Sequence, residues 1–204
     1  MEDLLMDGIA GQLRASADNL RSMSEDAGLL DGVARVASVC IEALRRGNKI
    51  LFAGNGGSAA DAQHLAGELV SRFNYDRPGL AAFALTTDTS VLTAIGNDYG
   101  YEHLFARQVE AVGSPGDVLF ALSTSGRSPN IVKALQAARA KGLVTVGLTG
   151  SGGGRMPELC DHCLRVPSEA TPRIQEGHIT IGHTVCWLIE RQIFPQAAAA
   201  GATA

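Results

Sequence analysis

Short apolar runs alternate with longer segments of helical periodicity from Lys49 onward, and this alternation restricts the fold more than any other feature of the chain. It predicts strands at residues 50–53, 80–85, 118–122, 143–148 and 162–166. It predicts helices at residues 59–72, 131–141 and 174–193, and a helix-rich stretch at residues 90–112 that a polar turn breaks near residues 96–98. Strands joined by helical crossovers pair in parallel, so we expect a doubly wound α/β fold with a mainly parallel five-stranded sheet. Ligands of such sheets bind at the carboxyl ends of the strands.

The N-terminal region carries helical periodicity without a strand signal, so we expect two helices ahead of the sheet. Ile9, Leu13 and Leu20 fall on one helical face, and Gly28 and Gly47 are the expected breaks. We assign residues 1–47 to N-terminal helices with oligomer contacts, residues 48–195 to the α/β domain and residues 196–204 to a frayed tail. Packing of the N-terminal helices on the sheet is the alternative to a role between subunits.

Composition and charge restrict the class of protein. With 204 residues, 46% of them hydrophobic, the chain is long enough for one domain with a full core. The net charge of −4 and the absence of a Lys/Arg run argue against nucleic acid and acidic membranes as partners. No signal peptide or membrane-spanning run is evident, and we interpret the four cysteines as core residues of a cytoplasmic protein (Cys40, Cys160, Cys163 and Cys186).

A cluster of hydroxyl side chains follows the apolar run at residues 118–122. The turn holds Ser123, Thr124, Ser125 and Ser128, and a helical pattern begins near residue 130. Helix N-terminal amides and hydroxyl groups together suit a phosphate group. No lysine or magnesium-ligand pattern accompanies the turn, so the expected ligand is a small phosphate ester rather than a nucleotide. Ordinary helix capping by serine is the competing interpretation.

A second candidate turn, Gly54-Asn55-Gly56-Gly57-Ser58, follows the first predicted strand. Its glycines allow the backbone to approach a ligand, and Ser58 is suited to cap the next helix. Asp61, three residues later, fits a capping box as well as a functional role. The turn lacks the GxGxxG spacing of a dinucleotide site. A tight connection without ligand contacts is the alternative.

Two helices carry acid/base candidates. His64 and Glu68 lie four residues apart on one helical face, a spacing suited to metal binding or to an acid/base pair. The alternative is a hydrogen bond between surface side chains. In the last helix, helical geometry favours Glu176 over Gln175 as the residue aligned with His183. A solvated polar face that includes His178 is the alternative for this helix.

These blocks together resemble the SIS (sugar isomerase) family, and within it the phosphoheptose isomerases. The resemblance extends from Leu44 to Ile193. The blocks that carry it, in chain order, are Gly54-Asn55-Gly56-Gly57-Ser58, Asp61-Ala62-Gln63-His64, Glu68-Leu69, Gly96-Asn97-Asp98-Tyr99-Gly100, Ser123-Thr124-Ser125-Gly126-Arg127-Ser128 and Arg173-Ile174-Gln175-Glu176-Gly177-His178. The resemblance implies a Rossmann-like or flavodoxin-like SIS domain over residues 48–195.

The resemblance also implies an activity and an assembly. The activity is isomerisation of sedoheptulose 7-phosphate to D-glycero-D-manno-heptose 7-phosphate, the first step toward nucleotide-activated heptoses of bacterial surface glycans such as lipopolysaccharide or capsule. The assembly is a homotetramer with active sites between subunits.

Carried over by position, the resemblance assigns roles to individual residues. It implies that the phosphate is held by Ser123, Thr124, Ser125 and Ser128. It implies that the sugar is lined by Asn55, Gly56, Gly57, Asn97 and Asp98, with Glu68 and Gln175 also at the substrate. It implies one zinc ion per subunit, bound by His64, Glu68, Gln175 and His183. For the zinc ligand we follow the family and prefer Gln175 to Glu176.

Isomerisation through an enediol requires one group to move a proton between two carbons and a second group to serve the oxygens. Glu68 as the carbon base and His183 as its partner have suitable chemistry, and we expect their helices to converge at the carboxyl edge of the sheet. Pro172 stands where some relatives carry an acidic residue, so any role of that carboxylate is absent.

Three other functions are consistent with parts of the pattern. A non-catalytic SIS protein that binds the replication initiator would share the segments at residues 59–64 and 77–80, but it has no need for Glu68 and His183. A phosphosugar-sensing regulator would require a DNA-binding domain, which the sequence lacks. Isomerisation of another sugar phosphate, such as a pentose phosphate, would use the same site.

Overall fold

The computed structural model describes residues 2–196 and contains a five-stranded sheet in which every strand pair is parallel. The order across the sheet is β2-β1-β3-β4-β5. The strands are β1 (Ile50–Gly54), β2 (Ala82–Ala84), β3 (Val118–Leu122), β4 (Val144–Thr149) and β5 (His162–Arg165). The predicted doubly wound α/β class and number of strands are confirmed.

The strands form because they are short apolar runs that can be covered on both faces. Every residue of β1 and β3 is buried, as expected for central strands of a parallel sheet. The edge strands are less uniform, and Phe83 in β2 is 55% exposed. The strand order reverses direction between β1 and β3, which is where ligands bind in sheets of this class.

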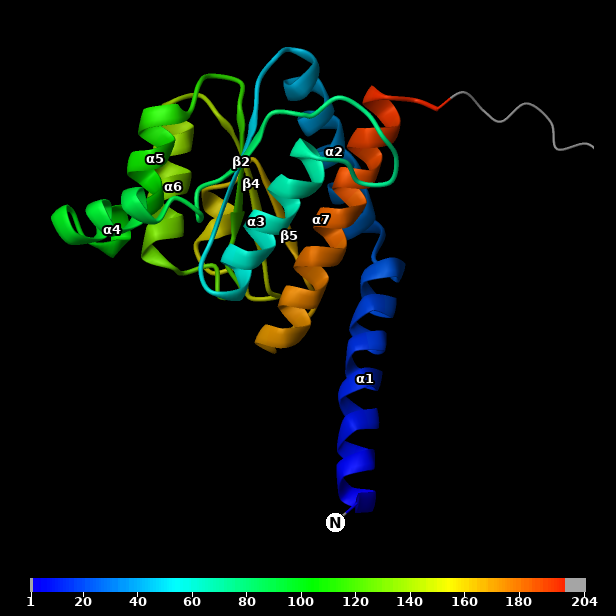
Figure 1. Cartoon of the computed structure of the whole chain (residues 1–204). Helices are drawn as coiled ribbons and strands as arrows, with labels where there is room; N and C mark the ends of the chain where they lie inside the picture. Colours follow the sequence, from blue (N-terminus) through cyan, green and yellow to red (C-terminus); the bar gives the residue numbers. More distant parts are fainter. Residues whose placement is uncertain (1, 197–204) are drawn as a thin grey trace, which may run out of the picture.

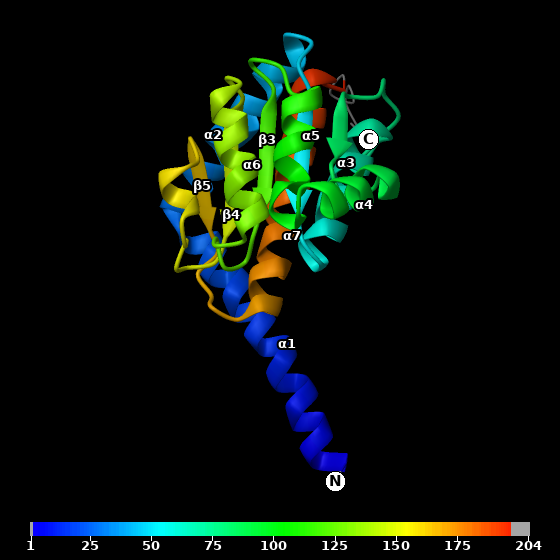
Figure 2. The ribbon, with the colours of Figure 1, turned by 90° about the vertical axis from the view of Figure 1, so that its left-hand side faces the viewer.

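Helices cover both faces of the sheet and form two separate apolar cores (Figures 1 and 2). One face is covered by α2 (Ala27–Arg45), α3 (Gly57–Val70) and α7 (Thr171–Ile193). The other face is covered by α4 (Thr89–Asp98), α5 (Leu104–Val112) and α6 (Pro129–Ala140). Two short 3-10 turns, η1 (Tyr101–His103) and η2 (Met156–Glu158), complete the described elements. The helix pair that matters most for the site is α3 and α7, which run side by side on one face.

The N-terminal region forms two helices, as expected, but the break lies at Asp26 rather than at Gly28. The first helix, α1, spans Glu2–Glu25, and Asp26 caps α2 by accepting a hydrogen bond from the backbone N–H of Leu29 at 3.0 Å. Gly28 lies inside the first turn of α2, so the sequence prediction there is wrong. An aspartate side chain that accepts a hydrogen bond from a free backbone N–H favours the start of a helix at that position. Asp26 therefore determines where α2 begins, and the nearby Gly28 does not.

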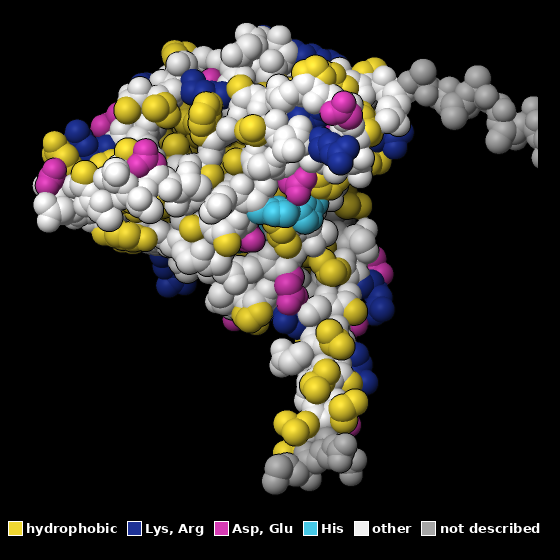
Figure 3. All heavy atoms as spheres, in the orientation of Figure 1, with side chains coloured by type: hydrophobic (Ala, Val, Ile, Leu, Met, Phe, Trp, Pro, Cys, Tyr) yellow, Lys and Arg dark blue, Asp and Glu magenta, His cyan; other side chains and the backbone are white. Residues whose placement is uncertain are grey.

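The helix α1 extends away from the rest of the chain (Figures 1 and 2). Its apolar side chains are therefore largely exposed: Leu4, Leu5, Met6, Ile9 and Leu13 are all more than half exposed. Figure 3 shows hydrophobic side chains along the projecting helix. Among the described residues, no helix is both long enough and apolar enough to cross a membrane.

Two other boundaries differ from expectation. The polar turn expected at residues 96–98 belongs to the last turn of α4, and the chain breaks instead at Tyr99 and Gly100. Gly100 has a φ of +88°, a conformation that glycine adopts without strain. The tail expected at residues 196–204 lies outside the described residues apart from Gln196.

Candidate active site

Two groups of predicted site residues lie at the carboxyl edge of the sheet. The glycine turn follows β1 and the Ser/Thr turn follows β3, and these strands are hydrogen-bonded neighbours. Asn55 and Asn130 bridge the two turns with reciprocal amide hydrogen bonds of 2.9 and 2.8 Å. The two turns therefore lie side by side at the edge of the sheet where ligands were expected to bind.

The hydroxyl groups of the Ser/Thr turn are not used for helix capping. Ser128 occupies the N-cap position of α6 but makes no side-chain hydrogen bond to the helix. Its Oγ instead lies 3.1 Å from the Oγ of Ser123, which is buried. Ser125 Oγ accepts a hydrogen bond from the backbone N–H of Arg127 at 3.2 Å. Pro129, the first residue of α6, has no N–H, and the N–H groups of Ile131 and Val132 are already hydrogen-bonded. The donors that the turn offers to an anionic ligand are therefore mainly its hydroxyl groups.

A cleft of about 320 Å³ opens beside this turn. Thr124, Ser125 and Arg127 line one side of it, and residues 150–153 after β4 line another. The start of α7 closes the cleft through Thr171 and Ile174. Hydroxyl groups, glycine backbone and one arginine are chemistry suited to a phosphate ester.

The glycine turn differs from expectation at Ser58. Helix α3 begins at Gly57 with Gly56 at the N-cap, and no side chain caps it. Ser58 is buried within the first turn, so the predicted cap is wrong. Ser58 is the second residue of α3 and so lies past the N-cap position. Gly54 permits the close packing of this turn on the strand end, because a Cβ there would lie 2.6 Å from the backbone carbon of Ser58.

Asn130 and Tyr101 are site residues that the sequence reasoning missed. Asn130 is 2% exposed and holds the side chain of Asn55 through both amide groups. The hydroxyl of Tyr101 donates to Asn55 Oδ1 at 3.0 Å from an exposed ring. The position of Asn130, two residues after Ser128 and in the first turn of α6, was the available signal.

Asn97 and Asp98 lie at the end of α4. Both are exposed, and the amide of Asn97 donates to a carboxylate oxygen of Asp98 at 2.8 Å. Tyr101 lies three residues after Asp98 and contacts Asn55 at the carboxyl edge of the sheet. Their role toward the sugar stays a prediction.

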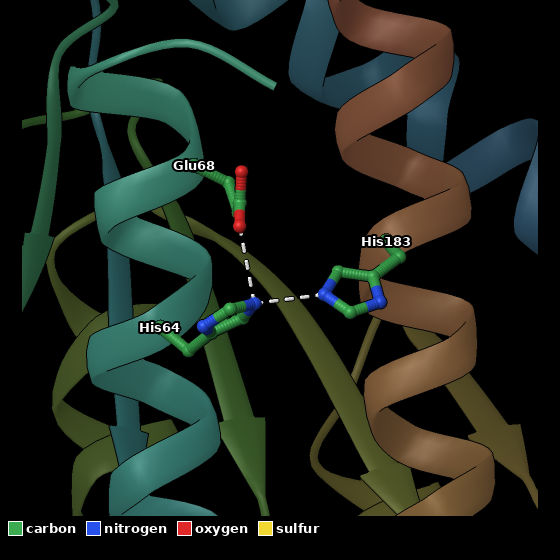
Figure 4. Close-up of side chains that lie close together, drawn as sticks. All are labelled: His64, Glu68 and His183. Atoms are coloured by element: carbon green, nitrogen blue, oxygen red, sulfur yellow. Dashed lines mark hydrogen bonds and ion pairs between the residues drawn. The ribbon is translucent and has the colours of Figure 1, made fainter. Parts of the chain in front are cut away.

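The acid/base candidates form a compact cluster between α3 and α7 (Figure 4). His64 Nε2 lies 3.1 Å from Glu68 Oε1 and 2.8 Å from His183 Nε2. Figure 4 shows the two imidazoles and the carboxylate pointing toward one another across the gap between the helices. Histidine side chains are visible at the surface in this region in Figure 3. The sequence spacing predicted the pair on α3, and the fold adds His183.

The environment of His183 keeps its imidazole neutral. Burial lowers the pKa of His183, the neighbouring His64 lowers it further, and Glu68 acts in the opposite direction. The ring of Phe73 packs against that of His183 with 5.7 Å between centroids. A neutral imidazole beside a carboxylate is suited both to proton transfer and to metal binding.

The cluster fits a divalent metal ion. One ligand atom from each of His64, Glu68 and His183 lies within 4.8 Å of the others. Two imidazole nitrogens and one carboxylate oxygen form a donor set that zinc accepts, with a fourth position left for another ligand. His64 is exposed, so a fourth ligand or a substrate can reach the site.

The cluster is not at the carboxyl edge of the sheet, and that part of our expectation is wrong. Helix α3 starts at this edge with Gly57 and runs back along the sheet. At 1.5 Å per residue, His64 lies about 10 Å and Glu68 about 16 Å along the helix from its start. His183 lies twelve residues into α7, at the corresponding depth. The parallel crossover itself causes this separation, because each helix leads away from the strand end that precedes it.

Gln175 and Glu176 both lie outside this cluster within the single chain. The side-chain amide of Gln175 lies against Gly57, at the start of α3. Glu176 accepts a hydrogen bond from Arg173 at 2.7 Å. The expected alignment of Glu176 with His183 therefore gives no contact, and Gln175 as a metal ligand stays a prediction. Gln175 instead lies beside the glycine turn, where a substrate contact was also predicted.

Two other expectations concern histidine and cysteine. His178 is fully buried, so the solvated-face interpretation is wrong for this residue. Burial lowers the pKa of His178 to about 4. All four cysteines are free thiols, and Cys40 and Cys186 are buried in the core that contains α2 and α7.

Comparison with known proteins agrees with this architecture. The SIS domain family model matches residues 13–150, which include both edge turns and α3 but not α7. The fold and the family match therefore define a protein of the SIS domain class.

Several phosphoheptose isomerases are similar to the chain. One from Aneurinibacillus thermoaerophilus is 58% identical over 188 residues, or 92% of this chain and 95% of that protein. One from Burkholderia pseudomallei (strain K96243) is 58% identical over 194 residues, or 95% and 98%. The solved phosphoheptose isomerase of Neisseria gonorrhoeae is 42% identical, with a TM-score of 0.86 over 91% of this chain and 98% of that one. That of Francisella tularensis is 36% identical, with a TM-score of 0.88 over the same shares.

The chain belongs to the phosphoheptose isomerase family of SIS domain proteins, and it is an isomerase enzyme. The resemblance drawn from the sequence motifs is thereby confirmed. The alternative of a non-catalytic protein that binds the replication initiator receives no support from these relatives.

Proposed function

We propose that the enzyme converts sedoheptulose 7-phosphate to D-glycero-D-manno-heptose 7-phosphate. The observation that carries the proposal is the convergence of Glu68, His64 and His183 within hydrogen-bonding distance of one another. A protein that only binds a sugar phosphate has no need for a carboxylate and two imidazoles at one exposed position. The relatives that are similar over almost the whole chain are phosphoheptose isomerases.

In this proposal Glu68 removes the proton from one of the first two carbons of the sugar and returns it to the other. His183 moves protons at the hydroxyl and carbonyl oxygens, which completes the aldose–ketose exchange through an enediol. Burial lowers the pKa of His183, which favours the neutral imidazole that metal binding requires. The hydroxyls of Ser123, Ser125 and Ser128 hold the distant phosphate, and binding there positions the sugar chain.

We propose zinc as the metal at the cluster, which His64, Glu68 and His183 would hold through the three atoms that face one another. The second carboxylate oxygen of Glu68 and the Nδ1–H of His183 would then remain for proton transfer. When bound, zinc would polarise oxygens of the substrate and hold the cluster together. The donor set supports this assignment, because two imidazoles and a carboxylate are common zinc ligands. Gln175 remains a candidate for the fourth ligand, as the family resemblance implies.

We also propose that the enzyme is a homotetramer with active sites between subunits. Two observations support this assembly. The cluster on α3 and α7 lies two to three helical turns from the phosphate-binding edge of the same chain, so one substrate fits more readily across edges of different chains. The exposed apolar side chains along α1, including Leu5, Ile9 and Leu13, are of the kind that subunit contacts cover.

The same considerations extend to the enzyme's setting. Free thiols in the core and an overall negative charge are consistent with the proposed cytoplasmic location and with small-molecule rather than nucleic-acid partners. The product would supply the synthesis of nucleotide-activated heptose.

The test is NMR of the purified enzyme with sedoheptulose 7-phosphate, in the presence and absence of a chelator. The proposal predicts a new anomeric proton signal of an aldoheptose phosphate and its loss on chelation, with recovery after zinc is added. Conversion of a pentose phosphate but not of sedoheptulose 7-phosphate would show that the proposed substrate is wrong and that the proposed isomerisation reaction is right. No conversion of any sugar phosphate would overturn the proposal.

A further inference from the structure

A buried ion pair lies beside the acid/base cluster and is not part of it. Arg77 comes from the loop between α3 and β2, and Glu190 comes from α7. Their side chains are 2% and 0% exposed, and Arg77 Nε lies 3.2 Å from Glu190 Oε1. Nothing in the sequence indicated that the two residues pair, because they lie 113 positions apart.

Arg77 binds the carboxyl end of α3, where Glu68 lies. Its Nη2 donates to the backbone carbonyl of Glu68 at 2.8 Å, and its Nη1 donates to that of Leu69 at 2.6 Å and that of Ser71 at 3.1 Å. The last carbonyls of a helix have no partner within the helix and carry partial negative charge. The guanidinium therefore fixes the turn of α3 that carries the proposed base.

Glu190 binds the loop that packs on His183. Its two carboxylate oxygens accept hydrogen bonds from the backbone N–H groups of Phe73 and Asn74, each at 2.8 Å. The ring of Phe73 lies against the imidazole of His183. Glu190 follows His183 by seven residues, which places both on the same side of α7. The carboxylate thus fixes the residue that contacts the second proposed acid/base group.

Stability alone is a weak reason for such an ion pair. Removing two charges from water costs about as much as their attraction returns, and apolar pairs of similar size often stabilise a core equally well. An apolar pair could not form hydrogen bonds with the backbone groups at the end of α3 and in the loop, so it would not hold them in place. Every donor that Arg77 directs at α3 and both oxygens of Glu190 are used for that purpose.

We infer that Arg77 and Glu190 are positioning residues that hold the carboxylate of Glu68 and the imidazole of His183 at their reactive separation. The ion pair and its hydrogen bonds connect the end of α3, the loop at Phe73 and Asn74, and α7 around the cluster. The inference rests on the proposed function, because it assigns the purpose of these contacts to proton transfer by Glu68 and His183.

The test compares Arg77→Lys and Glu190→Gln with a matched control, Asp117→Asn. Asp117 also forms a buried ion pair, at 2.6 Å with Lys49, and accepts backbone hydrogen bonds, but it lies at the start of β3 and contacts neither acid/base residue. We expect kcat for sedoheptulose 7-phosphate to fall about 10- to 100-fold in both test variants, because small displacements of reacting groups cost this much. KM should stay within about twofold, because the phosphate end is bound elsewhere.

A second readout requires no turnover. In the metal-free enzyme, the imidazole ¹⁵N signals of His64 and His183 should shift in Arg77→Lys and in Glu190→Gln and stay in place in Asp117→Asn. If wild-type enzyme fails to convert the substrate, the proposed function fails, and the imidazole signals alone then decide the positioning role. Unchanged imidazole signals, or a loss of kcat in Asp117→Asn equal to that in the test variants, would overturn the inference. Should Arg77→Lys not fold, Glu190→Gln, which keeps the shape of the side chain, supplies the same two readouts.

Discussion

The contact between α3 and α7 at Gly182 controls how closely His64 and His183 approach. Gly182 directly precedes His183, and its Cα faces Leu65, the neighbour of His64. A Cβ at this position would lie 2.5 Å from Leu65 Cδ1 and 2.6 Å from Cδ2. A methyl group at this position would therefore force the buried side chain of Leu65, or one of the two helices, to move.

The expected effect of Gly182→Ala follows from these distances. An ordinary contact begins near 3.4 Å, so Leu65 or one of the helices must move by about 1 Å. Overpacking of this kind costs about 1–3 kcal/mol, and the better helix propensity of alanine returns about 1 kcal/mol. We therefore expect a net loss of about 0–2 kcal/mol in the free energy of unfolding relative to the wild type. The imidazoles should separate by a similar distance, with zinc affinity about tenfold lower.

Thermal unfolding and zinc titration by calorimetry measure the two effects. The matched control is Gly67→Ala in α3, where the added methyl meets no atom within 4 Å. That variant should melt at or above the wild-type temperature, because alanine favours the helix. If Gly182→Ala is as stable as Gly67→Ala and binds zinc like the wild type, the close helix contact does not govern the cluster.

Three further predictions concern other parts of the molecule. Ser128→Ala should raise KM for sedoheptulose 7-phosphate about tenfold in steady-state assays with a smaller change in kcat, because it removes a phosphate donor; an unchanged KM would remove Ser128 from the site. Burial lowers the pKa of His178 from 6.5, its ordinary value, to about 4 in the folded protein. The folded state therefore keeps its full free energy of unfolding above about pH 6.5 and loses part of it as the pH falls toward 4, where the unfolded state binds a proton more readily. In denaturant titrations at several pH values the wild type should lose about 3 kcal/mol over this range relative to His178→Gln, and parallel curves would contradict the assignment. Leu13→Lys on α1 should reduce the oligomer's mass in analytical ultracentrifugation, whereas an intact tetramer would exclude that face from the interface.

The elements of the sheet could be predicted because their signals are local. The buried strands β1 and β3 are apolar runs bounded by polar turns, and their bounds agree with expectation to within a residue. The break between α1 and α2 was misplaced because glycine was given more weight than a capping aspartate. The sequence did contain the capping signal, because Asp26 lies three residues before Leu29, whose backbone N–H donates a hydrogen bond to its side chain.

The site was harder to predict because it depends on which residues of two helices face each other. A helical wheel correctly grouped His64 with Glu68 on α3, yet it favoured Glu176 as the neighbour of His183. In the structure the partners of His183 come from α3, and Glu176 is bound to Arg173. Periodicity identifies a face of a helix but not the depth at which a second helix crosses it. The same reasoning explains why the convergence was expected at the wrong end of α3.

The pairing of polar side chains across long sequence separations gave no signal in the sequence. Arg77 and Glu190, like Asn55 and Asn130, are distant in sequence and meet only when the chain is folded. Charged and amide residues are common at surfaces, so nothing in their local pattern indicated burial. These contacts appear only once helix packing is known.

The measurement that tests the account most directly is the turnover of sedoheptulose 7-phosphate by Glu68→Gln, with binding of the substrate measured in parallel. General base catalysis contributes about 10²- to 10⁴-fold, so kcat should fall by at least that lower value. Substrate affinity should stay close to that of the wild type, because the substitution leaves the proposed phosphate site in the Ser/Thr turn unchanged. Near-normal turnover in Glu68→Gln would contradict the assignment of Glu68 as the base and, with it, the proposed mechanism.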